Sequence, residues 1–182
     1  MTGSVATAFD KPETANFYRD VSEITGKLKP IDPLYLFCPA VLQTRARRFI
    51  DHFPGTVSYA VKANPETRVL ETLAATGLKN FDVASLDEVQ RVSENCPGAT
   101  LHFNNPVKAE EAIAESYLRY GVRSFALDEF SEFAKIQRCT GGDTNVIYTV
   151  RFKLDHAGAA YDFGSKFGAN EDYAVELLKA ID

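Results

Sequence analysis

Hydrophobic and polar positions follow two periods along most of this chain. From residue 57 onward, short runs of bulky residues are each followed by a segment whose apolar positions recur at helical spacing. The runs predict strands at 57–62, 80–84, 99–103, 122–127 and 145–152. The intervening segments predict helices at 66–76, 85–95, 108–120 and 129–139, and a last helix at 171–181. Strands that alternate with helices of this length predict parallel strands joined by crossover helices.

The pattern is less regular before residue 57. Residues 14–26 predict a short helix that ends at Gly26, and PLYLF at 33–37 predicts a further strand. Residues 39–53 predict an amphipathic helix with Pro39 in its first turn. We therefore expect an N-terminal extension over 1–33 and one domain over 34–182.

A polar or charged residue lies at the end of each predicted strand from residue 57 onward. These residues are Lys62, Asp82, Asn104, Asp128 and Arg151, at spacings of 20, 22, 24 and 23 residues. In a parallel (β/α) barrel the C-terminal ends of the strands form one rim, which carries the catalytic groups. A doubly wound sheet also binds ligands at these ends, usually with a glycine-rich first turn, but no G-x-G-x-x-G follows any predicted strand here. The pattern favours the barrel.

Lys62 ends the first of these strands, in the stretch VSYAVKANP at 57–65. Strand alternation places Lys62 on the same face as the small residues Ser58 and Ala60. A lysine desolvated in such a position is a good amine nucleophile for an aldehyde. The alternative is a strand-end lysine that points into water.

Composition narrows the classes of function. The chain has 182 residues, 45% hydrophobic residues and a net charge of -5, which indicates a packed core and gives no reason to expect nucleic acid or an acidic membrane as a partner. The cysteines (Cys38, Cys96, Cys139) and histidines (His52, His102, His156) show no metal-ligand spacing, so we interpret all six as structural or surface residues and expect no metal. No signal peptide and no membrane-spanning run is found, and we expect a cytoplasmic protein.

Several motifs together resemble a known family. They are YAVKANP at 59–65, FDVAS at 81–85, NNPVK at 104–108, the strand that ends at Arg151, and SKFGA at 165–169. In this order and spacing the chain resembles the N-terminal part of the ornithine/diaminopimelate-type pyridoxal-phosphate decarboxylases, ornithine decarboxylase and its relatives, which are built on an alanine-racemase-like barrel. The resemblance implies pyridoxal 5'-phosphate as cofactor and the decarboxylation of a basic amino acid, ornithine to putrescine in polyamine biosynthesis.

The same resemblance assigns roles to individual residues. Lys62 would bind the cofactor aldehyde covalently, with Asp82 and Arg151 beside it. Glu88 would support the same wall of the pocket, although it also stands at capping-box spacing from Ser85. Lys166 would lie at the interface of a homodimer.

The chain is short for this family. A complete barrel needs about 250 residues, whereas 126 residues run from Val57 to Asp182. We therefore expect an incomplete TIM-type (β/α) barrel with about five of the eight units, and without the family's C-terminal β-domain. Such a fragment would have unpaired sheet edges, low stability and no turnover alone.

Two other functions remain open from the sequence. One is a diaminopimelate or lysine decarboxylase, or a racemase-like enzyme that uses the same cofactor. The other is a non-catalytic regulatory homologue of the antizyme-inhibitor kind, against which the intact lysine of YAVKAN is a mild argument.

Overall fold

The computed structural model describes residues 18–153 and 167–182, and the chain divides into two compact units, Met1–Phe37 and Cys38–Asp182. In the first unit, helix α1 spans Val21–Leu28 and begins at Asp20, whose side chain accepts a hydrogen bond from the Glu23 backbone N–H at 2.9 Å. The helix was expected to end at Gly26. It continues through Gly26 to Leu28, and the C-cap residue Lys29 takes the left-handed conformation at φ 44°.

The strand predicted at 33–37 is wrong. This segment forms no strand in the structure, and its side chains from Leu34 to Phe37 are exposed. A hydrophobic run becomes a strand only when its backbone finds a pairing partner.

The second unit alternates helices and strands as the sequence predicts. Its elements are α2 (Pro39–His52), β1 (Ser58–Ala60), the 3-10 helix η1 (Val61–Ala63), α3 (Thr67–Ala75), β2 (Asn80–Val83), α4 (Leu86–Asn95), β3 (Thr100–Phe103), α5 (Glu110–Leu118), β4 (Ser124–Leu127), α6 (Phe130–Thr140), β5 (Ile147–Val150) and α7 (Glu171–Ile181). No helix in the described parts of the chain is long and apolar enough to cross a membrane.

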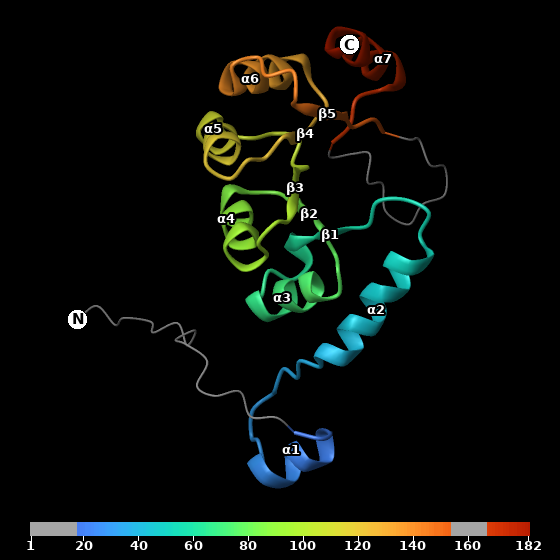
Figure 1. The fold of residues 1–182 in the computed structure, drawn as a ribbon, viewed down its shortest axis with the longest axis vertical. Helices are drawn as coiled ribbons and strands as arrows, with labels where there is room; N and C mark the ends of the chain where they lie inside the picture. Colours follow the sequence, from blue (N-terminus) through green and yellow to red (C-terminus); the bar gives the residue numbers. More distant parts are fainter. Residues whose placement is uncertain (1–17, 154–166) are drawn as a thin grey trace, which may run out of the picture. The chain divides into compact units, whose positions relative to one another are not determined.

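The five strands form one parallel sheet in the order β1-β2-β3-β4-β5. Each strand therefore lies beside the next one in the sequence, as in a (β/α) barrel, whereas a doubly wound sheet reverses its order at a switch point. Figure 1 shows α3, α4, α5 and α6 following one another along one face of this sheet. The prediction of a partial barrel with five β/α units is confirmed.

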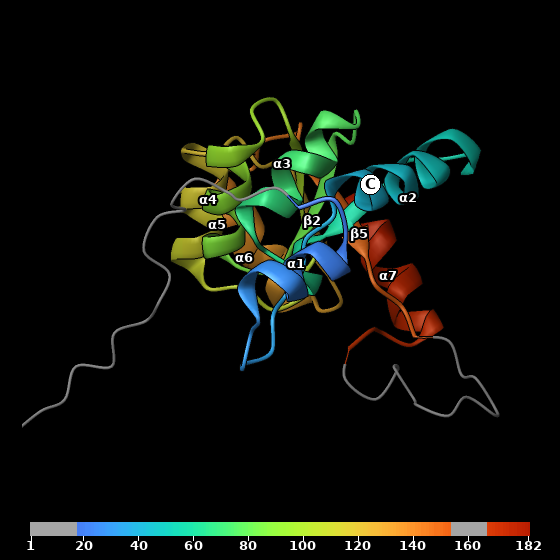
Figure 2. The ribbon, with the colours of Figure 1, turned by 90° about the horizontal axis from the view of Figure 1, so that it is seen from below.

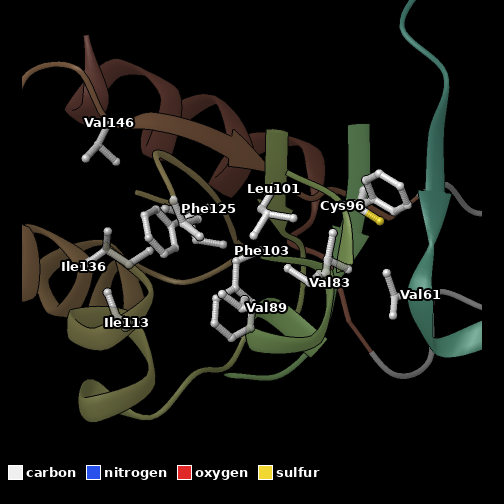
Figure 3. Close-up of a cluster of buried hydrophobic side chains, with 14 of the residues drawn as sticks. Val61, Val83, Val89, Cys96, Leu101, Phe103, Ile113, Phe125, Ile136 and Val146 are labelled. Carbon is white, nitrogen blue, oxygen red and sulfur yellow. The ribbon is translucent and has the colours of Figure 1, made fainter. Parts of the chain in front are cut away.

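The face of the sheet that the helices cover is apolar. Phe81, Val83, Phe103, Phe125 and Leu127 are at most 1% exposed and pack against the helices. Figure 3 shows Val83, Phe103 and Phe125, from three neighbouring strands, in one cluster with Val89, Ile113 and Ile136 of the helices. Burial of these side chains holds α4, α5 and α6 on the sheet.

The other face carries polar and small side chains. The backbone register aligns Ala60, Asp82, His102 and Ser124 across β1 to β4. Because strand side chains alternate, these four residues leave the sheet away from the helix-covered core. In Figure 2 the helices α3 to α6 lie together to one side of the strands, while α2 and α7 lie to the other. The polar face is the inward face of the partial barrel.

Candidate functional site

The candidate site lies at the C-terminal ends of the strands. Asn104, Asp128 and Arg151 each follow directly after a strand, Asp82 lies within β2, and Lys62 follows β1 in the turn η1. The strands are parallel, so these five positions share one edge of the sheet. The sequence predicted this arrangement from the spacing alone.

Lys62 lies in a turn and not in a strand, which corrects the predicted strand at 57–62. β1 ends at Ala60, and the chain then forms the 3-10 turn Val61–Ala63. Val61 is fully buried and anchors the turn, while the Tyr59 hydroxyl donates to the Asn64 carbonyl at 3.2 Å. Lys62 is exposed at the strand end, so the structure does not show the desolvated lysine that the sequence favoured, although the turn that carries Lys62 is fixed from both sides.

Asp82 is half-buried on the inward face of β2. Burial raises the pKa of its carboxyl group, and a hydrogen bond from Asn104 and the charges of Lys62, His102 and Arg151 oppose that rise. Two of these cations, Lys62 and Arg151, are the residues that the sequence places beside Asp82. The charges of Lys62 and Arg151 thus both act on the carboxyl group of Asp82.

Arg151, which follows β5, is the third member of the group formed with Lys62 and Asp82. Its Nη1 donates to the Asn104 carbonyl at 3.4 Å, and its guanidinium lies 5.4 Å from the centre of the Phe167 ring. The Arg151 carbonyl also accepts a hydrogen bond from the Ala169 N–H at 2.9 Å. Residues 167–169 therefore return to the rim beside Arg151, where Phe152 and Ala169 form a parallel bridge.

Gly168 connects residues 167–169 by a hydrogen bond to Asp128, the residue that follows β4. Its N–H donates to the Asp128 carboxylate at 2.8 Å. Gly168 has a φ of 108°, and a Cβ at this position would lie 3.0 Å from the backbone nitrogen of Lys153. Only glycine fits here without displacing the neighbouring backbone.

Glu88 has a structural role at the start of α4. The Ser85 hydroxyl accepts a hydrogen bond from the Glu88 N–H at 3.2 Å, as the capping-box spacing predicts. The Glu88 carboxylate in turn accepts from the Ala84 N–H at 2.7 Å, one residue before the N-cap. A role of Glu88 toward a cofactor stays a prediction.

Three residues on the inward face were not predicted as part of the site. His102, read from the sequence as structural or surface, contacts Asn80 and Ser124 through its two ring nitrogens. Strand alternation was the available signal, because it places His102 on the same side of the sheet as Asn104, which follows β3 two residues later. Lys166, predicted at a dimer interface, lies outside the described residues.

The donor set of this rim suits an anionic aldehyde cofactor. It offers one amine (Lys62), one guanidinium (Arg151) and one carboxyl of raised pKa (Asp82). Within residues 18–153 and 167–182, no three side chains of the His, Cys, Asp and Glu types converge as metal ligands do. A shallow hollow beside Gly77, Cys96 and Gly98 lies at the opposite ends of β2 and β3, away from Lys62.

Comparison with known proteins assigns the family. Residues 40–182 match the family model of the pyridoxal-dependent decarboxylases, in its pyridoxal binding domain. A lysine/ornithine decarboxylase of Selenomonas ruminantium is 37% identical over 131 residues, which are 71% of this chain and 32% of that protein. A diaminopimelate decarboxylase of Zymomonas mobilis is 33% identical over 163 residues, 82% of this chain and 38% of that protein.

Solved structures give the same result for the fold. A lysine decarboxylase from Selenomonas ruminantium superposes with a TM-score of 0.75 at 28% identity, over 92% of this chain and 43% of that one. The arginine decarboxylase of Paramecium bursaria Chlorella virus superposes with a TM-score of 0.66 at 28% identity, over 79% of this chain and 40% of that one.

The chain spans only part of the length of the relatives it matches, from 21% of the ornithine decarboxylase of Leishmania donovani to 38% of the Zymomonas enzyme. The resemblance found in the sequence motifs is confirmed, and so is the predicted cofactor, because the matched domain is the one that binds pyridoxal. The chain belongs to the pyridoxal-dependent decarboxylases, and its residues 40–182 are their pyridoxal-binding domain.

Proposed function

We propose that Lys62 is the residue to which pyridoxal 5'-phosphate binds covalently. We also propose that the complete gene product decarboxylates a basic amino acid, most directly ornithine to putrescine, the polyamine-forming reaction. One observation carries the proposal. Lys62 is exposed at the C-terminal end of β1, and its positive charge acts on the half-buried carboxyl group of Asp82.

Each side chain has a part in this proposal. Pyridoxal phosphate, when bound, supplies an electron sink for the bond to the departing carboxylate. Lys62 must present its Nζ as a neutral amine, and a neighbouring carboxyl of raised pKa accepts a proton more readily than an ordinary one. In this proposal Asp82 would take that proton, and Arg151 would offer a fixed positive charge for an anionic group of the cofactor or substrate.

The first experiment tests Lys62. The chain is mixed with pyridoxal phosphate, reduced with borohydride, digested, and the labelled lysine is located by mass spectrometry. We expect the label at Lys62 and its loss in Lys62→Met. Lys79→Met is the matched control, because Lys79 lies just before β2 at the opposite end of the strands and should leave labelling unchanged. A label spread over surface lysines in place of Lys62 contradicts the proposal.

The second experiment tests the substrate. The motifs FDVAS at 81–85 and NNPVK at 104–108 favour ornithine, whereas matched relatives include enzymes named for lysine, arginine and diaminopimelate. Release of carbon dioxide by the complete gene product is measured with each of the four amino acids. We expect the largest kcat/KM with ornithine, and a larger value with diaminopimelate contradicts the choice of a basic amino acid.

We further propose that the complete gene product is a homodimer. Lys166 supports this through the sequence motif SKFGA at 165–169 alone. Sedimentation of the wild type and of Lys166→Ala measures it, and a wild type that sediments as a monomer at all concentrations contradicts it.

A further inference from the structure

His102 on β3 has a partner for each of its ring nitrogens. Nδ1 lies 3.0 Å from the Ser124 hydroxyl on β4, and Nε2 lies 3.0 Å from Oδ1 of Asn80 on β2. The three side chains therefore form a polar row across three neighbouring strands on the inward face. An imidazole with both nitrogens partnered is held in one orientation.

Asp82 is the neighbour of His102 on the adjacent strand. The register pairs their Cα atoms directly across β2 and β3, and parallel strands lie about 4.8 Å apart. The two side chains leave the same face of the sheet. The positive charge of a protonated His102 accordingly acts on the Asp82 carboxyl group.

Asn80 and Ser124 can hydrogen-bond to His102 in its neutral and in its protonated state without any movement of heavy atoms. The Asn80 carbonyl oxygen accepts a hydrogen bond, which fixes a proton on Nε2. Nδ1 faces a hydroxyl group, which can donate to a neutral imidazole or rotate and accept from a charged one. A proton can therefore arrive at Nδ1 while the geometry beside Asp82 stays the same.

We propose that His102, fixed by Asn80 and Ser124, is a positioning residue that places a pH-dependent positive charge beside Asp82. Lys62 from the β1 side and Arg151 from the β5 side are the other charged groups that face Asp82 in the described residues. The partners of His102 can hydrogen-bond both a neutral and a charged ring, so His102 makes the charge beside Asp82 depend on pH.

The consequence for a cofactor rests on the proposed function of Lys62. A charged His102 stabilises the Asp82 carboxylate, so Asp82 takes up a proton from Lys62 less readily while His102 is protonated. The covalent attachment of pyridoxal phosphate should then weaken as His102 becomes protonated.

The test is a carboxyl ¹³C NMR titration of the full chain without cofactor, with the Asp82 resonance assigned by Asp82→Asn. We expect that resonance to move in two steps, a larger one from its own titration and a smaller one from the protonation of His102, its neighbour across β2 and β3. The smaller step should have the same midpoint as the ring ¹⁵N shifts of His102. It should vanish in His102→Gln and persist in His52→Gln, since His52 lies exposed on α2.

A single-step titration in the wild type overturns the proposal, and so does a second step whose midpoint differs from that of His102. The second criterion needs only the wild type, so it holds even where His102→Gln fails to fold. The affinity for pyridoxal phosphate, measured against pH, is a separate readout. Coupling by NMR without any labelling at Lys62 contradicts the proposed function alone, and labelling without coupling contradicts the role of His102 alone.

Discussion

The Lys108 ammonium group lies 3.0 Å from the Glu132 carboxylate, and their side chains are 0% and 5% exposed. Lys108 also donates to the carbonyl oxygens of Ala126, at 2.6 Å, and Asn105, at 2.8 Å. Burial lowers the pKa of Lys108, and the charge and hydrogen bond of Glu132 oppose this. The pair fastens the loop after β3 to β4 and α6, and this loop carries Asn104, which contacts Asp82.

Breaking this buried pair should destabilise the domain strongly. Removal of one partner leaves the other charge buried, which costs about 3 to 5 kcal/mol. We expect Glu132→Gln to lower the free energy of unfolding by an amount of this order, because Lys108 then stays buried without a counter-charge. Lys108→Met should cost less, because Lys135 still pairs with Glu132. Chemical denaturation monitored by circular dichroism measures it.

The matched control for that pair is exposed. Arg119, the C-cap of α5, and Glu115 form an i,i+4 pair at 3.2 Å, with side chains 68% and 41% exposed. Arg119→Met should cost less than about 1 kcal/mol. In addition, the double variant Lys108→Met with Glu132→Gln should cost less than the sum of the two single variants. Strict additivity would mean that the two side chains act independently.

A single substitution separates the two roles of Glu88. In Glu88→Gln the side chain keeps an oxygen that can accept from the Ala84 N–H, so stability should change by less than about 1 kcal/mol. If Glu88 also supports the cofactor through its charge, the affinity for pyridoxal phosphate falls in this variant. Absorbance titration with the cofactor measures that affinity. Glu111→Gln, in the exposed first turn of α5, controls for the loss of one negative charge.

The strands and helices of the second unit could be predicted because their signals are local. Alternation marks β2 and β3, Pro39 begins α2, and Ser85 caps α4 as predicted. The turn at Val61–Ala63 was missed because a short apolar run looks the same in a strand and in a turn that buries one valine. The hydroxyl of Tyr59, which holds this turn, gives no signal in the hydrophobic pattern.

The unpredicted parts of the site depend on residues far apart in the sequence. His102 is 22 residues from each of its partners, Asn80 and Ser124, and the backbone N–H of Lys108 donates to Glu132, 24 residues away. The strand residues become neighbours only when the parallel strands align in a particular register, and Lys108 meets Glu132 only when α6 packs beside the loop after β3. The rim residues were found because their spacing matches one β/α unit, which is itself a local quantity.

Gly168→Ala should disrupt the return of the chain to the rim. Its φ of 108° and the 3.0 Å approach to the Lys153 backbone nitrogen leave no room for a methyl group. Strain of this kind costs about 1 to 3 kcal/mol. We expect faster hydrogen exchange of the Ala169 and Lys153 amides, which bond to Arg151 and Ala169 respectively.

Gly141 provides the comparison for that substitution. It caps α6 at φ 65° with no atom within 4 Å of an added Cβ, so Gly141→Ala should cost only about 1 kcal/mol. Equal costs at the two positions would mean that the contact with Lys153 contributes nothing.

Asp82→Asn should stabilise the fold by an amount that increases with pH. The folded-state pKa of Asp82 is raised above its ordinary value of 3.8, so the folded protein binds this proton more tightly than the unfolded chain does. The wild type therefore loses stability as the pH rises from 3.8 through the folded-state pKa, and above it the full cost of the buried charge remains. Asparagine has no such cost.

Free energies of unfolding for both proteins, measured from below pH 3.8 to neutrality, should diverge in this window and then run parallel. A constant difference across the whole range, or a wild type that gains stability relative to Asp82→Asn as the pH rises, would show that the nearby cations outweigh the burial of Asp82.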